Sequence, residues 1–290
     1  MLSVWLRRLR KIVLIGLAGV VGIALVGVVV IYAVSTWKLS RHHEAAETAL
    51  RVTPVASLAT EGARLAHVNG CFGCHGDALT GRVFVDNFLV GRLSAPNLTR
   101  IIPHYTNQQI ADVIRGGVRS DGTGVVFMPS HTFVRLADAD IAAIVAYMRT
   151  LEPRADAAQD ASFGLIARAL IASGMMPLEP DVVDRSQVGP TMRPSDAAAL
   201  GPYVAKTTCA ICHGGDLHGD QQMQSPNLFA MVPAYSLADF KALMSTGVAI
   251  GGRKLGLMSE MSQSALKYLS DDEMAAVYAY LAATEAAKLP

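Results

Sequence analysis

The sequence predicts an all-α protein in which one N-terminal transmembrane helix precedes two tandem helical domains. Three observations predict this architecture: a long uncharged stretch near the start, a helix-rich pattern that occurs twice, and no strand-like alternation of apolar and polar residues. At 290 residues the chain is long enough for two small domains and an accessory segment. A formal net charge of +1 provides no dense basic face, so we expect no nucleic-acid partner.

The first element is an apolar segment long enough to span a bilayer. From Ile12 to Val34 there are 23 consecutive uncharged residues, and a helix of that length spans roughly 34 Å. The basic residues before it outnumber those just after it, which predicts a cytoplasmic N-terminus and export of everything after residue 35. A cleaved signal peptide is the alternative, but its apolar region is shorter and ends at small residues. We expect residues 1–37 to form a cytoplasmic stub and a retained anchor in the lipid bilayer.

All four cysteines belong to two copies of one motif, Cys-x-x-Cys-His. The cysteines are Cys71, Cys74, Cys209 and Cys212, and the histidines that complete the motifs are His75 and His213. Two thiols on one helical turn can add to the two vinyl groups of a haem, and the adjacent histidine then lies under the iron. A zinc site would need further ligands, and a thiol redox site would need a βαβ context. Because neither is apparent, the motifs predict two covalently bound haem c groups.

The segments after the two motifs match, which indicates an internal duplication. Pro-Asn-Leu occurs at 96–98 and 226–228, and Gly-Val occurs at 117–118 and 247–248. The expected divisions are a tether at 38–56, a first domain at 57–152, a linker at 153–195 and a second domain at 196–290. A short amphipathic helix is expected at 163–172, docked on one domain or between the two. The alternative is that this helix meets a partner subunit or the membrane.

The motifs and their order resemble those of class I c-type cytochromes. The resemblance covers about residues 57–151 and 196–286, and it is to membrane-anchored dihaem proteins such as the cytochrome c subunits of membrane dehydrogenases and oxidases. It implies that each half of the exported part is a cytochrome c domain of three or four helices around a haem.

In that family a methionine from the loop before the last helix usually completes the iron coordination, which favours the ferrous state and leaves no open position. The resemblance implies Met128 for the first haem, because it lies eight residues before Leu136, close to the last helix. Counting back eight residues from Leu269 implies Met261 for the second haem. Met258 competes with it, because Leu-Met resembles the element that holds the ligand in some second domains.

Histidine is the competing type of distal ligand, although a lone loop histidine is more often solvated. The histidine candidates are His104, His131 and His218. Arginines can pair with haem propionates or remain solvated. The arginine candidates are Arg92, Arg115, Arg119 and Arg253.

The resemblance implies an electron relay and not an enzyme. The expected location is the periplasmic face of a bacterial inner membrane, held by the single N-terminal pass. The expected partners are a membrane-bound respiratory or dehydrogenase complex and other redox proteins. A dihaem peroxidase or related dihaem oxidoreductase is the alternative, but it requires one haem with an openable position and a nearby acid–base group.

Overall fold

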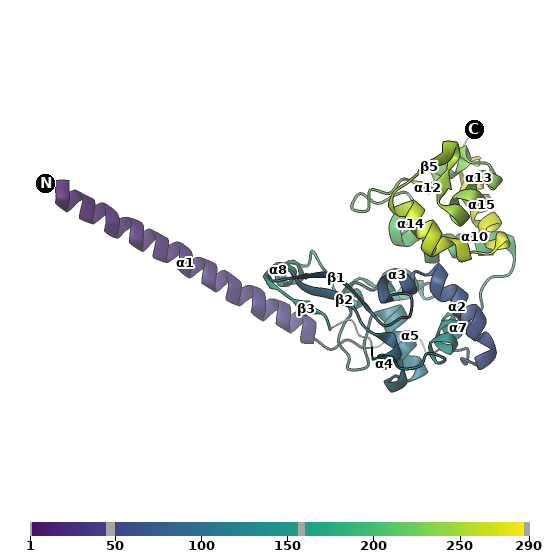
Figure 1. Ribbon diagram of the computed structural model, residues 1–290, viewed down its shortest axis with the longest axis horizontal. Helices are drawn as coiled ribbons and strands as arrows, with labels where there is room; N and C mark the ends of the chain where they lie inside the picture. Colours follow the sequence, from purple (N-terminus) through teal and green to yellow (C-terminus); the bar gives the residue numbers. More distant parts are fainter. Residues whose placement is uncertain (1, 45–49, 156–159, 287–290) are drawn as a thin grey trace.

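The computed structural model describes residues 2–44, 50–155 and 160–286 (Figure 1). Parts of the expected tether (45–49), linker (156–159) and second domain (287–290) lie outside the described residues, as does residue 1. The described chain is mostly helical, as the sequence predicts.

A single long helix, α1 (Leu2–Ser40), projects away from the rest of the molecule (Figure 1). Its segment Trp5–Ser40 is long and apolar enough to cross a membrane, with a mean hydropathy of 2.9 in its most apolar window. None of that window is buried against the described protein. Apolar side chains exposed along a helix of this length favour a lipid environment.

The first haem-motif domain is built on two helices that cross closely, α2 (Ala59–Val68) and α7 (Asp138–Met148). At the crossing, a Cβ added to Gly62 would lie 1.8 Å from the carbonyl oxygen of Ala143, so only glycine permits this approach. The remaining helices of the domain are α3 (Cys71–His75), α4 (Leu98–Ile101), α5 (Asn107–Gly116) and α6 (Ser130–Phe133).

The second haem-motif domain repeats this plan with α10 (Ala197–Val204) crossing α15 (Asp271–Ala286). Gly201 occupies the position of Gly62, and a Cβ on it would lie 2.3 Å from the carbonyl oxygen of Ala276. The remaining helices are α11 (Ala210–His213), α12 (Leu228–Met231), α13 (Leu237–Thr246) and α14 (Leu257–Ser264). Each domain therefore has an apolar cluster around one helix crossing, and Val68 and Ala137 of the first domain join the cluster of the second.

The expectation of no strands is wrong in two places. The first domain contains an antiparallel hairpin, β1 (Arg82–Asn87) with β2 (Gly91–Ala95), and β2 also pairs with β3 (Ser162–Phe163). The second domain contains a small hairpin, β4 (Val248–Ala249) with β5 (Arg253–Lys254). Five of the six side chains of β1 are exposed, so it lacks the alternation that marks a half-buried strand.

The linker contains two helices, α8 (Leu165–Ser173) and α9 (Glu179–Val182). Helix α8 packs beside the C-terminal part of α1 (Figure 1). The Arg168 guanidinium donates to the hydroxyl oxygens of Ser35 and Thr36 at 3.0 Å each. The linker helix therefore joins the first domain to the membrane segment. Single turns complete the described chain: η1 (Ala56–Leu58), η2 (Ile102–His104), η3 (Arg185–Gln187), η4 (Ala205–Cys209), η5 (Val232–Ala234), η6 (Ile250–Gly252) and η7 (Leu266–Tyr268).

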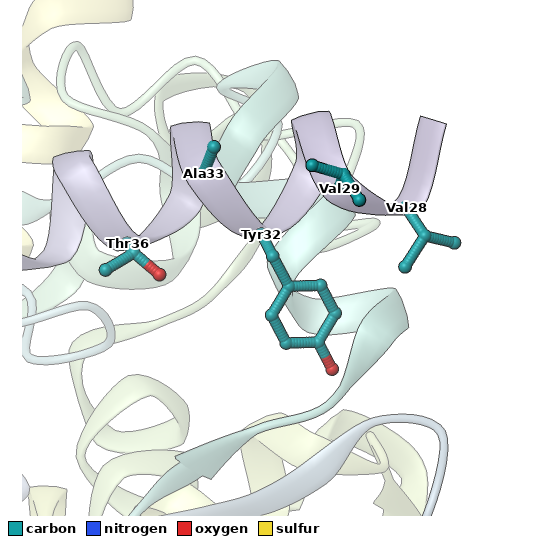
Figure 2. Close-up of a pocket in the computed structure, with 5 residues that line it drawn as sticks. All are labelled: Val28, Val29, Tyr32, Ala33 and Thr36. Carbon is teal, nitrogen blue, oxygen red and sulfur yellow. The ribbon is translucent and has the colours of Figure 1, made fainter. Parts of the chain in front are cut away.

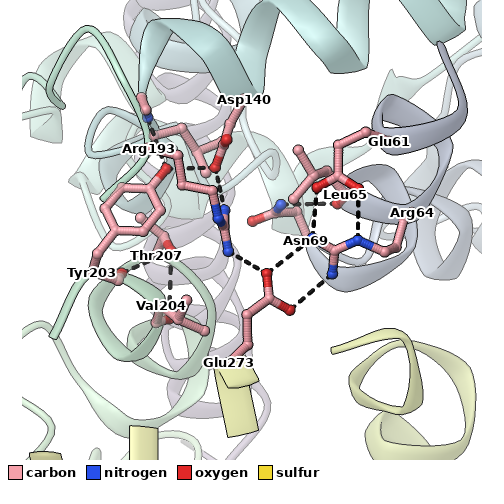
Figure 3. Close-up of polar contacts among 12 residues, drawn as sticks. Glu61, Arg64, Leu65, Asn69, Asp140, Arg193, Tyr203, Val204, Thr207 and Glu273 are labelled. Carbon is pink, nitrogen blue, oxygen red and sulfur yellow. Dashed lines mark hydrogen bonds and ion pairs between the residues drawn. The ribbon is translucent and has the colours of Figure 1, made fainter. Parts of the chain in front are cut away.

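The two domains are joined by a network of charged groups (Figure 3). Glu273 of the second domain accepts from Arg64 of the first domain at 2.8 and 2.9 Å, and it also pairs with Arg193 of the linker. Arg193 pairs in turn with Asp140 of α7, which accepts from the Tyr203 hydroxyl of α10 at 2.7 Å. Since these residues come from both domains and the linker, the network fixes the orientation of one domain to the other.

Candidate haem-binding sites

Both haem motifs lie on a single helical turn that ends at a glycine. Gly76 follows α3 with φ 78° and ψ 162°, and Gly214 follows α11 with φ 79° and ψ 154°. The chain enters the two turns differently. Gly70, in a left-handed conformation, precedes α3, whereas a π-helical turn ending at Cys209 precedes α11. Both geometries place two thiols and one imidazole on the same turn.

The loop after each motif folds back through a matched set of backbone hydrogen bonds. In the first copy, Gly81 N donates to His75 O at 2.8 Å and Leu98 N donates to Leu79 O at 2.9 Å. In the second copy, the corresponding bonds from Gly219 to His213 and from Leu228 to Leu217 are both 2.9 Å. Leu79 and Leu217 are fully buried and have positive φ values of 55° and 67°. A non-glycine residue rarely adopts this conformation. Its presence in both copies shows that the two halves of the duplication share the same loop conformation.

The two motif histidines have the same hydrogen bond. His75 Nδ1 lies 2.9 Å from the carbonyl oxygen of Pro96, and His213 Nδ1 lies 2.9 Å from that of Pro226. A proton on Nδ1 leaves Nε2 as the nitrogen that can bind a metal. Burial lowers the pKa of both rings, which favours the neutral imidazole that serves as a ligand. The proline carbonyls of the two Pro-Asn-Leu segments thus orient the two motif imidazoles. The sequence repeats these segments but does not show that they contact the histidines.

The four cysteines lack the features of a redox-active thiol pair. None of the four forms a disulfide. Burial raises the pKa of Cys71 and of Cys209 to about 12, whereas a reactive thiol redox site lowers this value. Within residues 2–44, 50–155 and 160–286, no cluster of three or more His, Cys, Asp or Glu residues has the arrangement of a metal site. The raised thiol pKa values are therefore the reverse of what a reactive thiol redox site requires.

The methionine candidates lie on elements that precede the last helix of each domain. Met128, two residues before α6, is half-buried and packs against the first domain's core. Met258 and Met261 are both half-buried and lie three residues apart on α14, and Met258 packs against the second domain's core. Met258 also follows Gly247 by eleven residues, as Met128 follows Gly117. Counting forward from the glycines thus favours Met258, while counting back from the last helices favours Met261.

The other sequence candidates have partners within the protein or are exposed. His131 Nδ1 lies 2.8 Å from Glu179 of α9, His104 is exposed, and His218 lies beside Asp216. The arginine candidates have these contacts: Arg92 pairs with Asp86, Arg115 with Asp138, Arg119 with the carbonyl oxygen of Gly124, and Arg253 with that of Ile250. Buried Arg115 keeps Nε and one terminal nitrogen without a hydrogen-bond partner among the described residues.

The residues present fit haem c in both domains. Each motif presents two unlinked thiols and an imidazole oriented through Nδ1, and each domain offers a half-buried methionine before its last helix. A thioether sulfur and an imidazole nitrogen are a usual axial pair for haem iron in cytochromes c.

This fold and donor set define a protein with two c-type cytochrome domains. The chain belongs to the cytochrome c family, whose model matches residues 59–152 and 198–285. It is similar to the fructose dehydrogenase cytochrome subunit of Gluconobacter japonicus, with 23% identity over 77% of this chain and 51% of that protein. It is also similar to the cytochrome c subunit of the quinone alcohol dehydrogenase of Gluconacetobacter polyoxogenes and to that of Komagataeibacter europaeus, with 29% identity over 58% of this chain and 38% of each relative. The chain thus spans about half, or less, of the length of these relatives.

Proposed function

We propose that the protein is an electron relay that holds two haem c groups, one in each domain, and has no catalytic site of its own. The observation on which this rests is the duplicated motif turn, in which each histidine has its Nδ1 2.9 Å from a proline carbonyl. A haem held by such a turn and capped by a methionine supplies one-electron chemistry and no open iron position.

In this proposal Cys71 and Cys74 would hold the first haem covalently, and His75 and Met128 would bind its iron. The proposed second haem is attached to Cys209 and Cys212, with His213 as its proximal ligand. For its distal ligand we favour Met258, because it contacts the domain core and keeps the spacing from the glycine. Met261, one turn further along α14, remains the competing ligand that mutation must separate from it.

The proposed location is the outer face of a bacterial inner membrane, with α1 as a single anchor and both domains in the periplasm. The cluster of Arg7, Arg8, Arg10 and Lys11 before the apolar span supports this orientation. The proposed electron donor is a membrane-associated dehydrogenase or respiratory complex, since the relatives are cytochrome subunits of dehydrogenases. Another redox protein would be the acceptor. The proposed domain limits remain 57–152 and 196–290, joined by the linker 153–195.

The experiment that tests this function measures covalent haem and electron transfer on the detergent-purified full chain. The pyridine haemochrome assay should give two haems per chain, and replacing Cys71 and Cys74 by serine should leave one. The matched control replaces Cys209 and Cys212 by serine and should also leave one, with a different midpoint potential. An oxidised soluble c-type cytochrome, used as the probe acceptor, should reoxidise both reduced haems. A single haem per chain, or turnover of hydrogen peroxide, contradicts the relay.

A further inference from the structure

Within the part of the chain that the structure describes, the most exposed large apolar side chain outside α1 is at the tip of the β1–β2 hairpin of the first domain. Among the described residues, Phe88 is 95% exposed, and its neighbour Leu89 is also exposed. The adjacent start of α8 adds Ile166, which is exposed as well. A contiguous apolar surface of this kind on a folded domain marks a contact with a membrane or a partner.

The hairpin tip has a fixed conformation. The Asn87 side-chain oxygen accepts from the backbone nitrogens of Leu89 at 3.1 Å and Val90 at 2.8 Å. Gly91, with φ 89°, lies so close to β3 that a Cβ on it would be 2.3 Å from the carbonyl oxygen of Ser162. Because these contacts fix the turn, the exposure of Phe88 is a property of the fold and not of a loose loop.

The hairpin is joined directly to the linker helix that packs beside α1. Ile166 N donates to Leu89 O, and Gly164 N donates to Val90 O, both at 2.9 Å. The apolar side chains of the tip and those at the start of α8 therefore form one surface, which we call the tip surface (Phe88, Leu89 and Ile166).

The contacts between α8 and α1 set the level of the tip surface along the membrane helix. Arg168 bonds to Ser35 and Thr36, whereas Lys38 Nζ donates to the carbonyl oxygens of Ile171 at 3.0 Å and Ala172 at 3.1 Å. The two helices therefore run in the same direction. Ile166 lies two residues before Arg168, about 3 Å closer to the apolar part of α1 at the rise of an α-helix.

The tip surface is consequently level with the end of the apolar span, near Tyr32 and Ala33. Figure 1 shows the hairpin and α8 on the side of the first domain that faces the N-terminus of α1. Tyr32 projects from α1 and lines a shallow, mostly apolar hollow with Val28, Val29, Ala33 and Thr36 (Figure 2). Tyr32 and Trp37 are the residue types that gather at the membrane–water interface.

The charged side chains near the tip surface are paired or stacked, so they do not oppose its placement at the membrane–water interface. Asp86, two residues before Phe88, is paired with Arg92 at 3.0 Å. The Arg168 guanidinium stacks over the Tyr32 ring at 4.7 Å. Cationic and aromatic side chains at the end of an apolar span interact favourably with lipid headgroups. Apolar side chains closer to the bilayer centre reach the acyl chains.

We propose that the tip surface inserts into the outer leaflet of the bilayer and forms a second membrane contact beside α1. The occupant of this surface is lipid, because the surface begins on α8, which packs beside α1, and lies level with the apolar part of α1. Because α8 holds the domain against α1, a second membrane contact fixes the orientation of the two together relative to the bilayer, whereas α1 alone would let them turn together about the helix axis. This inference rests on the proposed anchor, and the experiment separates the two.

The test uses single cysteines in the holoprotein, reconstituted in nanodiscs of phosphatidylcholine and phosphatidylglycerol. The native thiols are consumed by haem attachment, so Phe88→Cys provides one free thiol, and the visible spectrum reports correct assembly. The measured quantity is the rate of reaction with a charged, membrane-impermeant maleimide. Ile166→Cys is the second tip variant, Met223→Cys is the exposed control in the second domain, and Val20→Cys is the control in the anchor.

We expect both tip variants to react at least tenfold more slowly than Met223→Cys, with Val20→Cys protected as well. In the wild-type protein, a diazirine lipid should cross-link to the tryptic peptide 83–92. Fast labelling of Phe88→Cys with Val20→Cys protected overturns the second contact and leaves the anchor intact. Fast labelling of Val20→Cys as well overturns the anchor and with it the inference. Protection of Phe88→Cys without lipid cross-linking assigns the surface to a protein contact and overturns the proposal.

Discussion

Replacing Glu273 by glutamine should loosen the junction between the two cytochrome domains. The Glu273 side chain is 5% exposed and pairs with Arg64 and Arg193, which are 26% and 20% exposed. It also closes a capping box at the start of α15, where Ser270 N donates to it at 2.7 Å. Glutamine keeps an acceptor for that cap, so the substitution removes mainly the charge.

The expected cost follows from the burial of the network. Removing one partner of a buried ion pair costs about 3–5 kcal/mol. Water reaches both arginines in part, so we expect about 2 kcal/mol for Glu273→Gln. With a urea dependence of about 2 kcal/mol per M for a small domain, the unfolding midpoint should fall by about 1 M. The assay is urea unfolding of the purified full chain followed by the Soret band.

Glu61→Gln is the matched control, because Glu61 pairs with the same Arg64 but from an exposed position. An exposed pair three residues apart on a helix contributes about 0.5 kcal/mol, so its midpoint should fall by only about 0.25 M. Equal shifts for the two variants, or no shift for Glu273→Gln, would refute the reasoning.

The pH dependence of this effect has a definite sign. Burial by itself raises the pKa of Glu273, but the Arg64 hydrogen bonds, the Ser270 backbone and the Arg193 charge outweigh it and hold this pKa below 4.5. The stabilisation is therefore complete above pH 4.5 and is lost as the pH falls through the lower folded-state value. The difference between wild type and Glu273→Gln should shrink as the pH falls below 4.5.

Three further predictions concern the second haem, the stacked ring of His67 and the helix crossing. Met258→Leu should convert one haem to a high-spin, carbon-monoxide-binding form while Met261→Leu leaves both low-spin; the reverse result in optical spectra assigns Met261. His67 stacks between Phe72 and Tyr268 at 3.7 and 4.0 Å. Burial and then the Lys267 charge lower its pKa below 6.5, so stability should decrease as the pH falls below 6.5. His67→Phe should lessen the change in urea midpoint between pH 7.5 and 5.5; an unchanged dependence contradicts this role. Gly62→Ala should lower the midpoint by about 1 M or more through overpacking, while Gly116→Ala, whose Cβ has 3.7 Å of space, should change it far less.

The repeated helices and motif turns were predictable because their signals are local. The Cys-x-x-Cys-His turns and the apolar span from Ile12 to Val34 each lie within one continuous segment. Chemistry that depends on neighbouring residues in one turn can be inferred from spacing alone. The cytochrome c family model matches residues 59–152 and 198–285, which confirms the resemblance to c-type cytochromes that the motifs carry.

The β1–β2 hairpin was missed because its side chains do not alternate between core and solvent. Val83 and Phe84, on adjacent positions of β1, are both exposed. A pattern rule that relies on one buried face gives no signal for such a strand. The exposed apolar residues of the hairpin tip are the ones that we propose to contact lipid, next to the start of α8.

The junction between domains could not be predicted because it joins residues far apart in the chain. Arg64 and Glu273 are 209 residues apart, and neither differs in sequence from an ordinary solvated charge. The ambiguity between Met258 and Met261 has a different origin. The second domain has three more residues than the first between the glycine and the last helix, so the two ways of counting end on different methionines.

The most direct test of the two-haem relay is the spectroscopy of the detergent-purified full chain. Optical and electron paramagnetic resonance spectra would be recorded in the oxidised and reduced states, with and without carbon monoxide. The account predicts two low-spin haems with histidine–methionine signatures and no response to carbon monoxide. A high-spin haem, or one that binds carbon monoxide, would contradict it and indicate an open iron position suited to catalysis.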